Sequence, residues 1–127
     1  MRHQNNKLIQ LSTGNKERSL FIRTLLTNLI RAGAVTTTPK RAKVLKAEAD
    51  SFFSNLVRID SKYDEKDAKR ECIRMVKATI YGEAEGKKVI ETYLPKYREM
   101  KWKSFVANYK IWFRKWDGSE KILLKLI

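Results

Sequence analysis

The spacing of apolar residues changes near Phe105, and this change constrains the fold more than any other feature of the sequence. Before that point apolar residues recur every three or four positions, which is the period of helices that bury one face. From Phe105 to Trp116 apolar and polar residues alternate instead, which is the period of a β-strand. Asp117-Gly118-Ser119 is a turn signal, and it precedes a last apolar run from Lys121 to Ile127. The chain is therefore expected to end in a β-hairpin.

The first part of the sequence predicts a helix, a short strand and a second helix. The first helix starts near Asn15, a good capping residue, and ends at Gly33, which suits the left-handed position after a helix. The β-branched run from Ala34 to Thr38 predicts a strand. Pro39 follows this strand in a position typical of the first residue of a helix, and the second helix should run to about Ile59.

Apolar positions indicate which sides of these two helices face a core. The first helix should bury Phe21, Ile22, Leu25, Leu26 and Leu29, and the second should bury Ala42, Leu45, Ala49, Leu56 and one of Phe52 and Phe53. The same period places on the far side of the first helix Lys16, Arg23, Thr27 and Arg31. Those four side chains are therefore expected to face solvent.

Two more helices are expected in the middle of the chain. One begins near Asp64, where acidic residues favour the positive end of a helix dipole, and another covers Lys87 to Leu94 until Pro95 ends it. The predicted fold is thus an α+β domain ordered as helix, strand, three helices and two strands, with a small mixed sheet packed on the helices. With 127 residues, 43% of them hydrophobic, we expect one domain over residues 15–127, preceded by an extended basic arm over residues 1–14.

Positive charge is concentrated at the two ends of the sequence. The chain has 28 Lys and Arg against 14 Asp and Glu, a net charge of +14. Residues 1–46 hold 10 basic and 1 acidic side chain, residues 47–96 hold 10 of each, and residues 97–127 hold 8 basic and 3 acidic. A long segment of one sign attracts a polyanion, and nucleic acid is the common one.

The start of the second helix carries the sharpest cluster of cations. Its first two turns contain Lys40, Arg41, Lys43 and Lys46. The helix dipole is already positive there, so it repels these cations, and the sequence shows no evident internal partner for them. A phosphate bound there would accept hydrogen bonds from free backbone N–H groups and from these side chains. The alternative is a solvated basic face. The basic side chains of the neighbouring first segment favour the phosphate site.

Aromatic residues near the end of the chain alternate with cations, a mixture that can stack on bases and neutralise phosphates. The aromatic residues are Tyr97, Trp102, Phe105, Tyr109, Trp112 and Trp116. Strict alternation places Tyr109 and Phe113 on one face of the strand, and Lys110 and Trp112 on the other. Packing within the core or the hairpin is the preferred interpretation for most of the aromatics. Trp112 and Trp116 remain open, because they lie beside Arg114 and Lys115 near the predicted hairpin tip.

The sequence contains no recognisable catalytic or metal-binding motif. It has no glycine-rich phosphate loop or nucleophile elbow, and its one histidine, His3, lies far from its one cysteine, Cys72. Cys72 is expected to be a buried core side chain rather than a nucleophile. A run of about 18 apolar residues, as a membrane helix needs, is absent. We therefore expect a soluble intracellular protein that is not an enzyme and uses no cofactor or metal.

Together these residues resemble the bacterial-type large-subunit ribosomal protein seventeen family. The similarity rests on their joint spacing along nearly the whole chain: Met1-Arg2-His3, Arg18, Arg23, Leu29-Ile30-Arg31, Thr37-Thr38 before Pro39, Lys43, Leu45, Leu94-Pro95-Lys96-Tyr97, Tyr109-Lys110-Ile111 and the turn from Arg114 to Gly118. This resemblance implies a structural, ribonucleoprotein role in translation in the cytoplasm, with an organellar ribosome as the alternative location. The protein would lie in the large ribosomal subunit beside neighbouring ribosomal proteins, bind its ribosomal RNA near the outlet of the nascent-chain tunnel, and need neither a membrane nor a small-molecule substrate.

The charge pattern and the resemblance together name a set of candidate RNA-binding residues. They are Arg2, His3, Lys7, Lys16, Arg18, Arg23, Arg31, Lys40, Arg41, Lys43, Lys46, Lys110 and Arg114. Two other interpretations remain: a free RNA- or DNA-binding regulator, which needs a helix that aims polar side chains at bases, and a basic peripheral membrane or chaperone-like protein, which needs an exposed apolar face.

Overall fold

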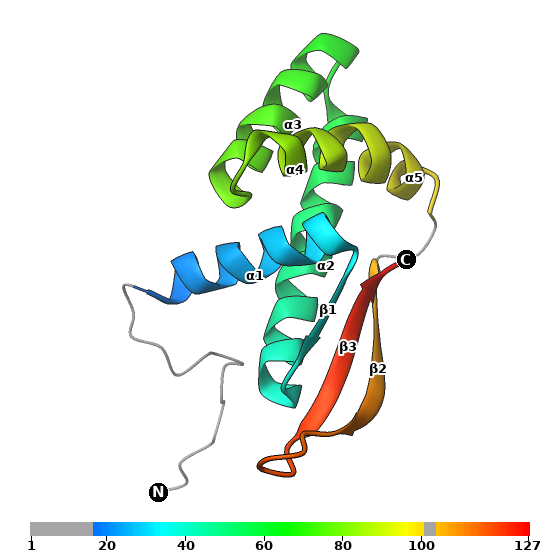
Figure 1. Ribbon diagram of the computed structural model, residues 1–127. Coiled ribbons are helices and arrows are strands. Elements are labelled where there is room, and N and C mark those ends of the chain that lie inside the picture. Colours follow the sequence, from blue (N-terminus) through cyan, green and yellow to red (C-terminus); the bar gives the residue numbers. More distant parts are fainter. Residues whose placement is uncertain (1–16, 101–103) are drawn as a thin grey trace, which may run out of the picture.

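The computed structural model describes residues 17–100 and 104–127, and it confirms the predicted α+β fold (Figure 1). The elements in chain order are α1 (Arg18–Ala32), β1 (Ala34–Thr37), α2 (Pro39–Lys62), α3 (Glu65–Thr79), α4 (Glu83–Lys88), the π-helical turn η1 (Val89–Tyr93), α5 (Leu94–Arg98), β2 (Val106–Phe113) and β3 (Glu120–Leu126). The expected arm over residues 1–14 and the expected cap, Asn15, lie outside the described residues.

Helix α2 is the axis around which the other elements are arranged (Figure 1). The sheet packs along its N-terminal half, and α1 crosses it, while α3, α4 and α5 gather toward the end where α2 finishes. The predicted inner face of α2 is confirmed, because all six apolar candidates, including both phenylalanines, are buried. The tip of the β2–β3 hairpin lies at the same end of the molecule as the N-terminus of α2.

The sheet is antiparallel throughout, which corrects the expectation of a mixed sheet. Its strand order is β1-β3-β2, and β3 pairs antiparallel with both neighbours. Because β1 and β2 run in the same direction, a mixed sheet would have needed these two strands to pair with each other. The hairpin instead returns β3 into the space between them, so each pairing runs in opposite directions.

The boundaries between α1, β1 and α2 follow the predicted local signals. Gly33 has a φ of 77°, and its N–H donates to the carbonyl of Leu29 at 2.8 Å, closing α1. Pro39 is the first residue of α2, where its missing N–H costs no hydrogen bond. These signals act within a few residues, which is why the sequence alone reveals them.

The far side of α1 is partly covered, contrary to expectation. Thr27 is only 3% exposed, although the helical period placed it toward solvent. Its hydroxyl donates to the carbonyl of Arg23 at 2.7 Å and accepts from the N–H of Tyr81 at 3.1 Å. The connection between α3 and α4 therefore packs on the side of α1 that the sequence assigned to solvent. Of the predicted inner stripe, Leu26 and Leu29 are fully buried.

Pro95 does not end the fourth helix, which is a second correction. The helical path continues through η1 into α5, and Pro95 lies in the first turn of α5. The N–H of Leu94 donates to the carbonyl of Val89, five residues back. This wider turn shifts the hydrogen-bond register just before the proline. Pro95 therefore lies in the first turn of a helix, where a residue needs no N–H to donate within the helix.

Aromatic residues of the last third divide between the core and the surface. Tyr97 and Phe105 are buried against Phe53, as expected. The packing expectation is wrong for Tyr109, which is 54% exposed. Trp112 and Trp116, which the sequence left open, are 73% and 80% exposed. Trp102 lies outside the described residues. The hairpin therefore projects beyond the helices that cover its base.

Candidate nucleic-acid interface

The N-terminus of α2 presents cations and unpaired backbone donors to solvent. Thr38 precedes the helix in an extended conformation, but its side chain makes no capping hydrogen bond. The first turn contains no acidic residue, and Lys40, Arg41 and Lys43 are all exposed. Because the first N–H groups of a helix have no partner within it, this end can receive an anion.

Two cations of this cluster have partners within the protein. Lys46 forms an ion pair with Asp50 at 2.8 Å and donates to the Ser104 hydroxyl at 3.2 Å, which corrects the expectation that it lacks an internal partner. Asp50 also accepts the N–H of Phe105 at 2.8 Å, so this group holds the start of β2 against α2. The guanidinium of Arg41 lies 5.0 Å from the ring centre of Phe21. Lys40 and Lys43 have no ion-pair partner among the described residues.

A groove of about 350 Å³ lies between the first turn of α2 and the hairpin. It is lined by Pro39, Ala42, Lys43, Asn108, Tyr109, Lys110, Glu120 and Ile122. Lys43 and Lys110, both predicted from the sequence as RNA contacts, thus face one groove although they are far apart in the chain. The amide of Asn108 was not among the predicted contacts, but strict alternation already placed it on the same side of β2 as Lys110. The carboxylate of Glu120 reduces the local positive charge.

Arg114 lies at the hairpin tip and is partly neutralised. Its Nε donates to Asp117 at 3.0 Å, and its guanidinium covers the Trp116 ring at 4.7 Å from the ring centre. Asp117 also accepts the N–H of Ser119 at 3.1 Å, and Gly118 adopts a φ of 69°, which confirms the predicted turn. Arg114 therefore stiffens the tip and presents its charge beside an exposed indole.

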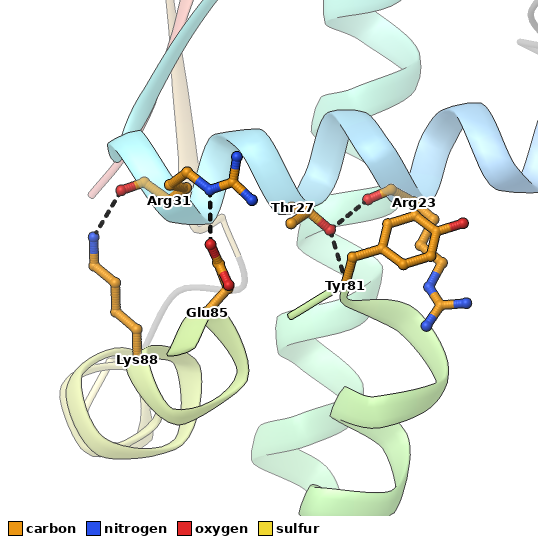
Figure 2. Close-up of polar contacts among 6 residues, drawn as sticks. All are labelled: Arg23, Thr27, Arg31, Tyr81, Glu85 and Lys88. Carbon is orange, nitrogen blue, oxygen red and sulfur yellow. Dashed lines mark hydrogen bonds and ion pairs between the residues drawn. The ribbon is translucent and has the colours of Figure 1, made fainter. Parts of the chain in front are cut away.

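Arg23 and Arg31 point into a contact between α1 and the α3–α4 region (Figure 2). The Arg23 guanidinium lies 4.0 Å from the ring centre of Tyr81 and donates to the carbonyl of Lys77 at 3.0 Å. Arg31 Nε donates to Glu85 at 2.7 Å, and Lys88 donates to the carbonyl of Arg31 at 3.1 Å. Both arginine side chains therefore connect α1 to the α3–α4 region.

A family model described as Ribosomal protein L17 matches residues 21–127, which include every described helix except the first three residues of α1. The chain belongs to this ribosomal protein family. A large ribosomal subunit protein bL17 from Desulforamulus reducens is 32% identical over 117 residues, which cover 92% of this chain and 94% of that relative. Proteins of the same name from Clostridium botulinum and Clostridium perfringens are each 26% identical over 118 residues, which cover 93% of this chain and 96% of each relative.

The predicted RNA contacts of the first segment precede the residues that the family model matches. Arg2, His3, Lys7 and Lys16 lie outside the described residues, and Arg18 is half-buried in the first turn of α1. The described contacts that the structure brings together are those at the α2 N-terminus and on the hairpin. The groove between the first turn of α2 and the hairpin is therefore the candidate nucleic-acid interface of this ribosomal L17 family member.

The described residues give little support for a metal site, a reactive cysteine or a membrane-spanning helix. No group of three or more His, Cys, Asp or Glu side chains is placed there to hold a metal ion. Cys72 is 1% exposed, as predicted, and burial raises the pKa of its thiol. Within the same residues, no helix is both long enough and apolar enough to span a membrane.

The contact between Arg31 and Glu85 predicts a loss of stability in acid. The hydrogen bond from Arg31 keeps the pKa of Glu85 below its ordinary value of 4.5. As the pH falls through that value, the unfolded chain takes up the proton first, so the folded state loses stability. We expect Glu85→Gln to have a shallower fall in melting temperature between about pH 5 and 3 than the wild type.

A matched control for this measurement is Glu83→Gln, which removes a more exposed carboxylate from the same helix. It should leave the acid dependence of the melting temperature close to that of the wild type. Equal curves for Glu85→Gln and the wild type would contradict a stabilising role for the ion pair.

Proposed function

We propose that this protein is a structural constituent of the large ribosomal subunit and binds large-subunit ribosomal RNA. The family match supports the ribosomal role. The observation that carries the RNA contact is the N-terminus of α2, which no side chain caps. Lys40 and Lys43 are exposed there, and Lys43 shares a groove with Lys110 of the hairpin. A phosphate in this groove would meet backbone donors and ammonium groups together.

The described geometry suits recognition of folded RNA through its backbone. Lysine ammonium groups are point charges that contact phosphates without reading sequence, so most of the affinity would come from phosphates and the specificity from RNA shape. We also propose that the protein lies near the outlet of the nascent-chain tunnel, beside other ribosomal proteins, in the ribosomes of the cytoplasm; the resemblance to the family supports this location.

The proposal predicts strongly salt-dependent binding to large-subunit RNA. If about six phosphates are neutralised, the plot of log affinity against log salt should have a slope of about −4 to −5, at roughly 0.7 to 0.9 per phosphate. Filter binding or fluorescence anisotropy with purified large-subunit RNA measures this slope. A slope near zero would exclude an interface dominated by phosphates.

Co-sedimentation of the tagged protein with ribosomal particles tests the cellular part of the proposal. We expect the protein in the large-subunit and assembled-ribosome fractions, released by high salt. A free pool without a large-subunit peak would instead favour a free RNA- or DNA-binding regulator.

A further inference from the structure

An irregularity in β2 decides which side chains share a face of the sheet. Residues directly opposite each other in paired strands point to the same side. Lys110 pairs with Ile122, but the next pair is Trp112 with Lys121, so Ile111 is an extra residue without a partner. Such a β-bulge reverses the alternation of the residues beyond it relative to those before it.

The bulge moves Trp112 to the face that carries Tyr109. Tyr109 pairs with Leu123, and Leu123 lies two positions from Lys121, the partner of Trp112. Strict alternation had placed Trp112 with Lys110 instead, so the structure corrects that expectation. Both side chains now belong to one side of the sheet, and their partners on β3 are two positions apart, which is about 7 Å along the strand.

This side of the sheet is open, and we call it the outer face. Its members are Ala34 and Thr36 of β1, Ala107, Tyr109 and Trp112 of β2, and Lys121, Leu123 and Lys125 of β3. None of these residues is buried, whereas Ile122, Leu124 and Leu126 on the opposite side pack into the core. The helices therefore cover one side of the sheet only.

The chemistry of the outer face suits a flexible polyanion with flat apolar groups. Trp112 and Tyr109 are 73% and 54% exposed, an unusual display for large aromatic rings. Lys121 and Lys125 accompany them, and the outer face contains no carboxylate, because Glu120 pairs with Phe113 and points to the helix side. Bases can stack on the rings while the phosphates between them meet the lysines.

Two other partners fit this face less well. Lysine is depleted in the cores of protein interfaces, whereas here lysines lie among the aromatic rings. Duplex RNA keeps its bases stacked on one another, so it cannot use exposed rings in this way. An antiparallel sheet with exposed aromatics on its open side is also a known arrangement for binding unpaired bases.

We propose that the outer face binds an unpaired segment of RNA, with bases stacked on Tyr109 and Trp112 and phosphates held by Lys121 and Lys125. This inference rests on the proposed ribosomal RNA-binding function and adds a second contact to it. The groove at the α2 N-terminus involves the helix side of the sheet, to which Asn108 and Lys110 belong by their pairing, and Tyr109 borders both surfaces. The hairpin would thus contribute to two adjoining RNA contacts.

The test is binding of the full-length protein to a labelled single-stranded RNA of roughly 8 to 12 nucleotides, compared with a duplex of the same sequence. We expect Trp112→Ala to weaken single-strand binding roughly 5- to 100-fold, and Tyr109→Ala to act similarly. Trp112→Phe should recover much of the affinity, because a phenyl ring still stacks. Thermal melting should show each variant folded, since both side chains are exposed.

Tyr63→Ala is the matched control, because Tyr63 is 44% exposed and follows α2 at the other end of the molecule. It should bind the single strand like the wild type. Equal binding by Trp112→Ala and the wild type would overturn the inference, as would a preference of the wild type for the duplex. So would a wild-type dimer that Trp112→Ala dissociates, because the face would then bind a second copy.

The outcomes also separate this inference from the proposed function. A protein that co-sediments with large subunits but ignores the single-stranded probe overturns the outer-face proposal alone. A protein that binds the probe through Trp112 yet never co-sediments overturns the ribosomal assignment alone, and supports the outer face as an RNA-binding surface.

Discussion

Replacing Phe53 with alanine is expected to lower the free energy of unfolding by about 3 to 5 kcal/mol. Phe53 is 1% exposed, and its ring lies 4.9 Å from that of Tyr97 and 5.9 Å from that of Phe105, measured between ring centres. These neighbours come from α5 and from the start of β2, so the side chain joins α2 to two elements that follow it much later in the chain. Small domains are stable by only about 5 to 15 kcal/mol, so this one change removes a large share.

The size of this effect depends on the surroundings being unable to close the cavity. Tyr97 is itself held against Tyr93, whose ring lies 5.7 Å away, so collapse toward the missing ring is restricted. Urea denaturation of the variant and the wild type measures the difference. Leu20→Ala is a suitable control, because Leu20 is 52% exposed and its replacement should change the free energy of unfolding little. A loss below about 1 kcal/mol for Phe53→Ala would show that the aromatic cluster is not the centre of the core.

The parts of the fold that local signals determine were predictable from the sequence. Gly33 and Pro39 act on the few residues around them, so the end of α1, β1 and the start of α2 are where the sequence placed them. The mixed sheet was a wrong prediction, because strand order depends on where β3 returns, and no local pattern encodes that. The rule that Pro95 ends a helix also failed, because a π-helical turn changed the hydrogen-bond register just before it.

Prediction of the site from the sequence was limited in the same way. Charge clustering found Lys40 and Lys43, since an excess of one sign at a helix start is visible in the sequence. It did not separate these cations from Arg31, which has the same chemistry but pairs with Glu85, 54 positions later. Nor did it find that Trp112 shares a face with Tyr109, because a single unpaired residue in β2 reverses the alternation.

The difference between exposed and paired cations leads to a prediction about RNA binding. Lys43 and Lys110 line the groove, and Lys40 lies exposed in the adjoining first turn of α2. Lys46 is left unchanged because its ion pair with Asp50 holds the start of β2. The triple variant Lys40→Gln/Lys43→Gln/Lys110→Gln should lose three phosphate contacts. Its slope against log salt should therefore be smaller in magnitude by about 2 to 3 than that of the wild type, at roughly 0.7 to 0.9 per phosphate.

The same variant should be as stable as the wild type or slightly more stable, because removing a cation from a helix N-terminus relieves about 0.3 to 1 kcal/mol of repulsion. The control, Lys66→Gln/Lys69→Gln/Lys96→Gln, makes the same change in net charge on exposed helix surfaces away from the groove. If net charge alone attracted the RNA, the slope of log affinity against log salt would decrease in magnitude equally in both triple variants. The groove would then be an ordinary solvated surface. Loss confined to the groove variant, with an unchanged or raised melting temperature, would show that these three lysines are retained for the phosphates they bind and not for the stability of the fold.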